Sequence, residues 1–201
     1  MQMIGKKNIV LISGVTGVYL ALFGITFWLL MPCQAHVAEK YLSVGKWTTF
    51  LVLPHGFRVV LTWLWQGRAV VLLLPGTALQ ALIIAEYYGL GAAEWVAMVL
   101  SYSCCSLIAF EVVNWFGGNA YASYDNPANW RTVLMVGALA GLINGVINMQ
   151  LVFNQFSLEA QLWIALNLFV GGMTGLLLWL FAMCFASRHL KECAFLLVTR
   201  D

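Results

Sequence analysis

Three ionisable side chains lie inside long apolar segments of this sequence, where a charge is costly. Arg58 lies in the apolar segment 47–65, and His55 precedes it by three residues. Glu111 lies in the apolar segment 92–116. A charged group at the centre of a bilayer costs roughly 2.5–3.5 kcal/mol on insertion scales. Residues of this kind are therefore the first candidates for a binding site.

Arg58 and Glu111 fit either a structural or a binding role. A guanidinium reaches about two turns along a helix, so the two charges could form a buried ion pair if their helices are neighbours. His55 shares a helix face with Arg58, and together they could bind an anion or a carboxylate. His55 could equally be a hydrogen-bonded structural histidine. The sequence leaves these alternatives open.

Amide side chains add further polar groups to the apolar segments. Asn144 and Asn148 lie one helical turn apart in segment 132–153, and Gln80 lies in segment 69–85. Such amides commonly bond neighbouring helices, each contributing about 1 kcal/mol, but their number also fits a small polar cavity. Asn144 and Asn148 therefore join the candidate ligand-binding residues.

Catalytic and metal-binding motifs are missing from the sequence. It contains no G-x-S-x-G, no H-E-x-x-H and no phosphate-binding loop motif. Its five cysteines form no C-x-x-C and no Cys/His cluster, which argues against a metal site and against a disulfide framework. We expect a protein that is not an enzyme, with no catalytic residue, metal or cofactor.

The composition is that of a membrane protein. Of the 201 residues, 62% are hydrophobic and 9% are charged, whereas soluble domains are about 25% charged. A net charge of +2 without a basic stripe also argues against nucleic-acid binding. We predict one all-α transmembrane domain, a bundle over residues 1–201 in contact with the lipid bilayer. Its six predicted spans are 8–31, 47–65, 69–85, 92–116, 132–153 and 160–186.

The distribution of Lys and Arg predicts the orientation in the membrane. With the N-terminus inside, only Lys40 and Lys46 lie outside. Seven basic residues then lie on the inner side: Lys6, Lys7, Arg68, Arg131, Arg188, Lys191 and Arg200. This positive-inside bias predicts that both termini are cytoplasmic, in the inner membrane of a bacterial cell.

Small residues recur every four positions in the predicted spans. Gly137, Gly141 and Gly145 form one such stripe, and Gly17 lies in another with Ser13 and Ala21. Such stripes let helices approach closely. The contact could lie within the bundle, or against a membrane-protein partner or a second copy of the chain.

The second and third predicted spans carry a short pattern of Pro, Gly and Arg. It consists of Leu53-Pro54-His55-Gly56, then Gly67-Arg68, then Pro75-Gly76 and Leu79. This pattern, over about residues 50–80, resembles the opening hairpin of MASE1-type integral membrane sensor domains. Those domains usually have about eight spans and a fused kinase or cyclase. Here the resemblance implies a sensory or small-ligand-binding module whose output is a separate partner.

Two other roles fit the same sequence. Six spans in about 200 residues, with a small-residue stripe on the first, are similar to the substrate-binding subunits of energy-coupling-factor transporters, which take up vitamins or metals. The protein could also be an accessory subunit of a larger membrane complex. A sensor or transporter subunit predicts a polar cavity, whereas an accessory subunit predicts a dry interior in which Arg58 and Glu111 are paired.

Overall fold

The computed structural model is helical, and no strand occurs among the residues that it describes. It describes residues 6–42, 50–117, 120–122, 130–151 and 157–198. The predicted all-α class is confirmed. The helices are α1 (Lys6–Gly24), η1 (Ile25–Leu30), α2 (Met31–Leu42), α3 (Leu53–Trp65), α4 (Arg68–Tyr88), α5 (Ala92–Trp115), α6 (Trp130–Leu151) and α7 (Leu158–Val198).

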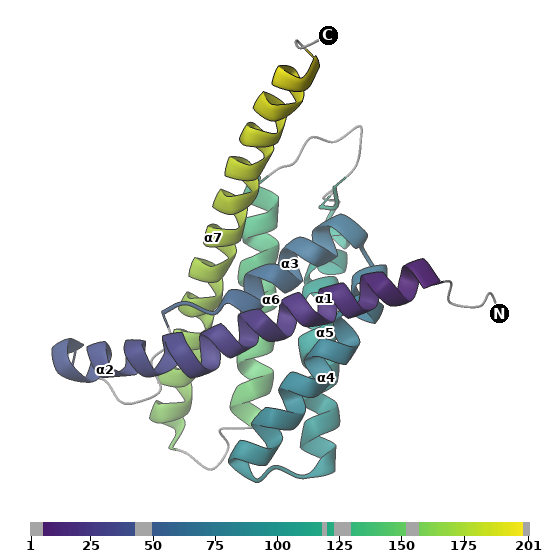
Figure 1. Ribbon diagram of the computed structural model, residues 1–201. Helices are drawn as coiled ribbons and strands as arrows, with labels where there is room; N and C mark the ends of the chain where they lie inside the picture. Colours follow the sequence, from purple (N-terminus) through teal and green to yellow (C-terminus); the bar gives the residue numbers. More distant parts are fainter. Residues whose placement is uncertain (1–5, 43–49, 118–119, 123–129, 152–156, 199–201) are drawn as a thin grey trace.

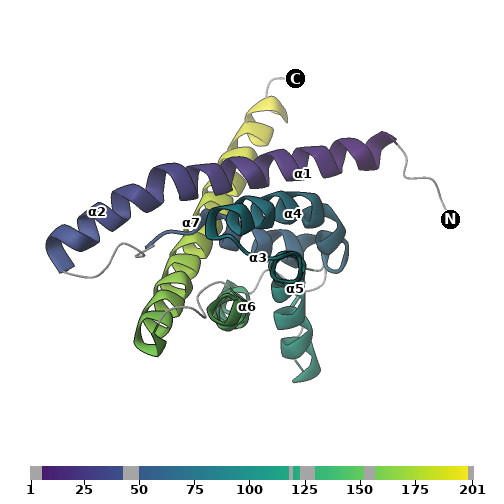
Figure 2. The same cartoon turned by 90° about the horizontal axis from the view of Figure 1, so that it is seen from below.

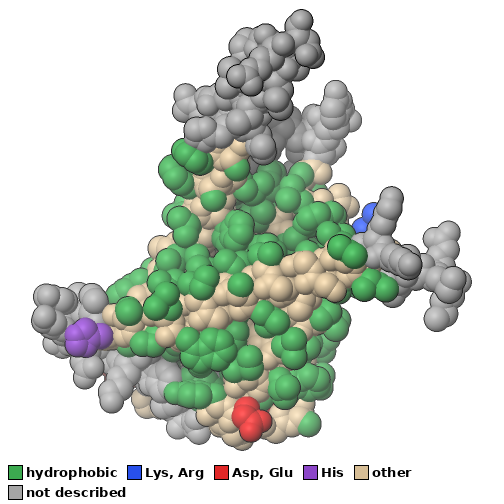
Figure 3. All heavy atoms as spheres, in the orientation of Figure 1, with side chains coloured by type: hydrophobic (Ala, Val, Ile, Leu, Met, Phe, Trp, Pro, Cys, Tyr) green, Lys and Arg blue, Asp and Glu red, His purple; other side chains and the backbone are tan. Residues whose placement is uncertain are grey.

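Five helical segments within the described part of the chain are long and apolar enough to cross a membrane. They are Asn8–His36, Arg68–Tyr88, Ala92–Trp115, Trp130–Leu151 and Gln161–Ala186. Hydrophobic side chains cover most of the described surface in the view of Figure 3, as expected for a surface that faces lipid tails. The chain therefore has the character of a multi-pass membrane protein.

The first span differs from its predicted end at Pro32. The helix continues through the π-helical turn η1 into α2 and reaches Leu42. A proline normally interrupts an α-helix because it lacks an N–H and clashes with the preceding turn. In η1 the Met31 amide bonds the Thr26 carbonyl five residues back, and this wider turn accommodates the proline.

The second span also differs from its prediction. A continuous helix over 47–65 was expected, but α3 begins at Leu53 and has 13 residues, whereas residues 47–49 lie outside the described part. At 1.5 Å per residue it is about 20 Å long, too short for a hydrocarbon core of about 30 Å. Nine of its residues are buried, and it contacts α1, α4, α5, α6 and α7. Thus α3 is a short helix enclosed by the others (Figures 1 and 2).

The non-helical residues 50–52 lead into α3 beside Gly171, in the N-terminal half of α7. The Val52 amide donates to the Gly171 carbonyl at 2.8 Å, and the Leu51 amide donates to Gln34 Oε1 at 3.0 Å. Non-helical backbone at membrane depth requires such partners, because hydrocarbon offers none. These bonds explain why the helix can begin as late as Leu53.

Two glycines allow α3 and α7 to cross in backbone contact. A Cβ atom at Gly56 would lie 2.6 Å from the Gly175 carbonyl oxygen. A Cβ atom at Gly175 would overlap the Val52 carbonyl oxygen. No side chain fits at either position, and so the close approach depends on both glycines.

The predicted glycine stripe of α6 faces other helices of the bundle. A Cβ atom at Gly137 would overlap Leu176 of α7, and one at Gly141 would lie 3.3 Å from Phe169. At Gly145 the nearest atom is farther away, the Ala165 carbonyl oxygen at 3.7 Å. This stripe therefore packs within the chain, against α7.

Gly17 does not make the corresponding contact. Nothing lies within 4 Å of a Cβ atom built there, and Gly17 is exposed together with Ser13 and Ala21. The reason is that α1 packs mainly on α4, beside which it lies lengthwise in Figure 2. It buries the other side, with Tyr19 packed on α4, so the packing role expected of Gly17 within the bundle is wrong.

Candidate functional site

A cavity of about 120 Å³ lies where α3 begins, among the surrounding helices. Its polar lining comes from η1 and from α3 to α6: Thr26, Arg58, Gln80, Tyr102, Asn144 and Asn148. Three of these, Arg58, Asn144 and Asn148, are residues that the sequence singled out as ligand-binding. The helical bundle therefore brings together polar groups that are separated by up to 122 positions along the chain.

Of the described residues that line this cavity, Arg58 alone is charged. Its side chain is 3% exposed, and its Nη1 donates to the Tyr102 carbonyl at 3.2 Å. The guanidinium also lies 5.2 Å from the centroid of the Tyr102 ring, whereas Nε has no hydrogen-bond partner. No ion pair of Arg58 occurs among the described residues. A buried guanidinium without a carboxylate is costly unless an anion compensates its charge.

The start of α3 adds positive potential to the same cavity. Val52, the N-cap residue of the helix, and Pro54 both line it, and the Leu53 amide donates to Thr26 Oγ1 at 3.4 Å. The N-terminus of a helix carries about half a positive charge. With Arg58 one turn further along, both features favour an anion in the cavity.

The amides lie in a hydrogen-bonded chain that leaves one acceptor free. The Tyr102 hydroxyl donates to Asn148 Oδ1 at 2.7 Å, and Asn148 Nδ2 donates to the Asn144 carbonyl at 2.7 Å. The Asn144 Oδ1 atom is buried without a partner. On the opposite wall, the Tyr19 hydroxyl donates to Gln80 Oε1 and so orients that amide. The lining of the cavity thus includes both an unused acceptor and a cation.

His55 is not part of this cavity, although it was expected there. It is 2% exposed, and its Nε2 lies 3.1 Å from the Gly137 carbonyl oxygen. Because a carbonyl only accepts, Nε2 must carry a proton and donate. Gly141 and Gly172 leave room for the imidazole ring. His55 is therefore a packed, hydrogen-bonded histidine that joins α3 to α6 and does not line the cavity.

Glu111 does not pair with Arg58, so the expected counter-charge is wrong. Its side chain is exposed and accepts a hydrogen bond from the Tyr121 hydroxyl at 2.6 Å. Burial, followed by this hydrogen bond and the nearby carboxylate, raises the pKa of Tyr121 above its ordinary value of 10. Glu111 follows Tyr102 by nine residues, which places it about 180° away around α5. That spacing was already visible in the sequence.

Comparison with known proteins supplies no relative. No family model matches the chain, and neither a curated protein nor a solved structure matches it. Among the described residues, no three His, Cys, Asp or Glu side chains are grouped so that they could hold a metal ion. The chemistry of the Arg58 cavity is therefore the basis for assigning a role.

Two residues that line the cavity, Gln80 and Tyr102, were not among the ligand-binding candidates predicted from the sequence. Gln80 looked like an ordinary polar contact between helices, because a single amide in a span usually is one, and Tyr102 was not singled out. Their signal was their position near the middle of their helices, at the same depth as Arg58. Only the packing of α4 and α5 around α3 showed that they face it.

Proposed function

We propose that this protein binds a small anionic ligand at Arg58 in the membrane and acts through a separate partner, as a sensory module of the MASE1 kind. One observation carries the proposal: a guanidinium that is 3% exposed, with no ion-pair partner among the described residues, lines a cavity together with other polar side chains. Such a charge is retained at a cost of several kcal/mol, so its presence favours a functional role.

The cavity indicates which chemical group binds. A volume of about 120 Å³ equals that of about four water molecules at about 30 Å³ each, enough for a carboxylate and a few more atoms. The unpartnered Asn144 Oδ1 favours a ligand that also brings a hydroxyl or an amide donor. A carboxylate with such a donor nearby suits both Arg58 and Asn144.

Other roles fit less well or require further partners. An accessory subunit would keep a dry interior with Arg58 and Glu111 paired, whereas Arg58 lies in a cavity and Glu111 lies elsewhere. A substrate-binding subunit of an uptake transporter remains the second candidate. The exposed small residues of α1, Ser13, Gly17 and Ala21, favour it, because they leave a face on which a coupling subunit could pack.

The finer topology is also part of the proposal. Residues 50–52 and α3 complete a sixth crossing beside five long helices, and both termini lie in the cytoplasm of a bacterial cell. The seven-to-two distribution of Lys and Arg supports this.

A fusion experiment tests the topology. Alkaline phosphatase fused after residue 201 should be inactive, and a fluorescent protein at the same place should fluoresce, because the C-terminus is cytoplasmic. A phosphatase fused in the connection after Tyr88 should be active and serves as the control. An active enzyme at residue 201 would show that the number of crossings is odd.

A binding experiment tests the ligand site by varying the charge at constant chain length. The protein in nanodiscs should bind decanoate at least tenfold more tightly than decanamide, because only the carboxylate pairs with the Arg58 guanidinium. Arg58→Gln should abolish this preference. Glu111→Gln is the matched control and should retain it, since Glu111 lies away from the cavity. Equal affinities in the unaltered protein would rule out the proposed function.

A further inference from the structure

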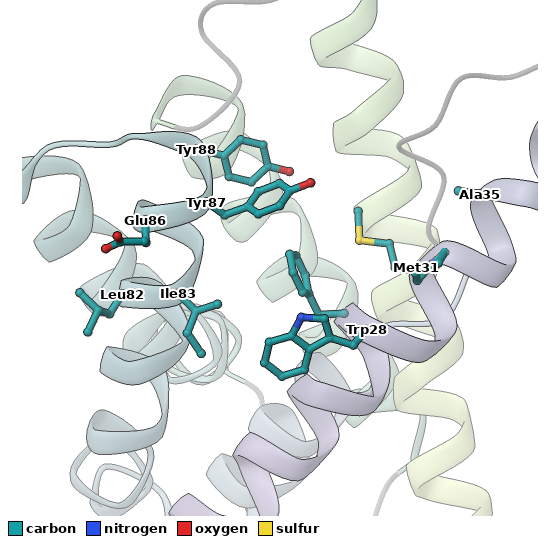
Figure 4. Close-up of a pocket in the computed structure, with 10 residues that line it drawn as sticks. Trp28, Met31, Ala35, Leu82, Ile83, Glu86, Tyr87 and Tyr88 are labelled. Carbon is teal, nitrogen blue, oxygen red and sulfur yellow. The ribbon is translucent and has the colours of Figure 1, made fainter.

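A larger hollow adjoins the Arg58 cavity between η1–α2 and the C-terminal end of α4. This groove has a volume of about 790 Å³, and six residues that line it are Phe27, Trp28, Met31, Ile83, Tyr87 and Tyr88. In Figure 4, Tyr87 and Tyr88 extend from α4 toward Met31 across the gap, whereas the Glu86 carboxylate points away from it. The groove is therefore lined mainly by aromatic and apolar side chains.

The groove and the Arg58 cavity are neighbours with a shared wall. Phe27, Met31 and Tyr88 line both hollows. At the other side the groove opens to the surface, where Trp28 is 63% exposed and Tyr87 is 64% exposed. That surface belongs to helices that are apolar enough to lie in a membrane, so the groove opens toward lipid.

The volumes of the two hollows indicate that each would hold a different part of one ligand. Pockets that enclose a whole small molecule have volumes of about 300–1,000 Å³, and the Arg58 cavity is well below that range. It has room for a charged head group alone. The remainder of the ligand must continue past Phe27 and Tyr88 into the apolar groove, which is large enough for a hydrocarbon chain.

We propose that the ligand is a single-chain amphiphile with a carboxylate head group, which enters sideways from the bilayer. The carboxylate pairs with Arg58, and the hydrocarbon chain lies between η1–α2 and α4 against the aromatic side chains. This inference rests on the proposed function and adds to it the class of ligand. It assigns the groove to the same molecule as the cavity, and it excludes a fully water-soluble ligand.

A comparison of two carboxylates that differ only in chain length tests the inference. In nanodiscs, with concentrations expressed as mole fractions in the bilayer, hexadecanoate should bind at least tenfold more tightly than hexanoate, because only the longer chain fills the groove. If the two bind equally, the inference is wrong. The preference for decanoate over decanamide would then still stand, so this failure is distinct from failure of the proposed function.

A substitution that fills the groove gives an independent test. Ala35 lines the groove and is half-buried, so Ala35→Trp should weaken hexadecanoate binding at least tenfold and leave hexanoate binding unchanged. Ala182→Trp, at an exposed position on α7, is the matched control and should bind like the parent. Unchanged hexadecanoate binding in Ala35→Trp would contradict the inference.

Photolabelling of the unaltered protein keeps the inference testable even if Ala35→Trp does not fold. A hexadecanoate that carries a diazirine at the chain end should label peptides from residues 27–35 and 82–88, and excess hexadecanoate should compete with it. Labelling confined to α7 would overturn the inference. Competition by diacyl phosphatidic acid as strong as that by hexadecanoate would also overturn it, since the proposed ligand has one chain.

Discussion

Alanine at Gly175 should lower the free energy of unfolding by about 3 kcal/mol, because added atoms in a packed interior force backbone shifts. The added Cβ atom would overlap the Val52 carbonyl oxygen, which belongs to the backbone and cannot rotate away as a side chain would. The Val52 amide also donates a hydrogen bond to the Gly171 carbonyl, so the segment before α3 cannot move without breaking that bond. Thermal unfolding in detergent measures the change, and Gly56→Ala should behave in the same way.

Gly17→Ala is the matched control for this substitution. It makes the same chemical change in a helix, but nothing lies within 4 Å of the added atom. Alanine is favoured over glycine in a helix by about 1 kcal/mol, so this variant should be neutral or slightly more stable. If Gly175→Ala unfolded at the same temperature as Gly17→Ala, the close crossing of α3 and α7 would be wrong.

Methionine at Arg58 should increase the stability of the protein by about 2 kcal/mol while it abolishes decanoate binding. Replacing buried charges by apolar groups of similar size is often neutral or stabilising by about 1–4 kcal/mol, because the cost of desolvation disappears. Arg58 has no carboxylate partner in the described part of the chain, and so little attraction is lost with its charge. Opposite changes in stability and binding are typical of a functional residue.

Arg68→Met provides the comparison for Arg58→Met. Arg68 is exposed at the start of α4, so its replacement should change stability by less than about 0.5 kcal/mol and leave decanoate binding unaltered. Thermal unfolding and binding are measured on the same nanodisc preparations. A loss of several kcal/mol in Arg58→Met would instead assign the guanidinium a structural role through its contacts with Tyr102.

Local properties of the chain were sufficient for predicting four of the long helices and the candidate polar residues. For each of α4 to α7, at least one predicted end of the span lies within a few residues of the end of the helix. The prediction succeeds because a long run of apolar side chains is stable in lipid only as a helix. Arg58, Asn144 and Asn148 were recognised because polar groups in such runs are expensive. No tertiary contact is needed for either inference.

The start of α3 could not be predicted from the sequence. Residues 50–52 are as apolar as the helix that follows, so hydropathy alone extends the span to residue 47. They lie outside the helix because Gly171 and Gln34, which are distant in the chain, bond their backbone amides. The continuation of the first helix past Pro32 could not be predicted either, because it depends on the wide turn η1.

By itself the sequence determined that this chain is an all-helical membrane protein with a few costly polar groups, because composition and hydropathy are properties of each residue and its near neighbours. Only the tertiary structure decided which of those groups meet. It placed Arg58 with Asn144 and Asn148 around one cavity, turned Glu111 outward and packed His55 against glycines. The physical reason is that a site depends on the rotation and crossing of whole helices, which side-chain packing between distant segments sets.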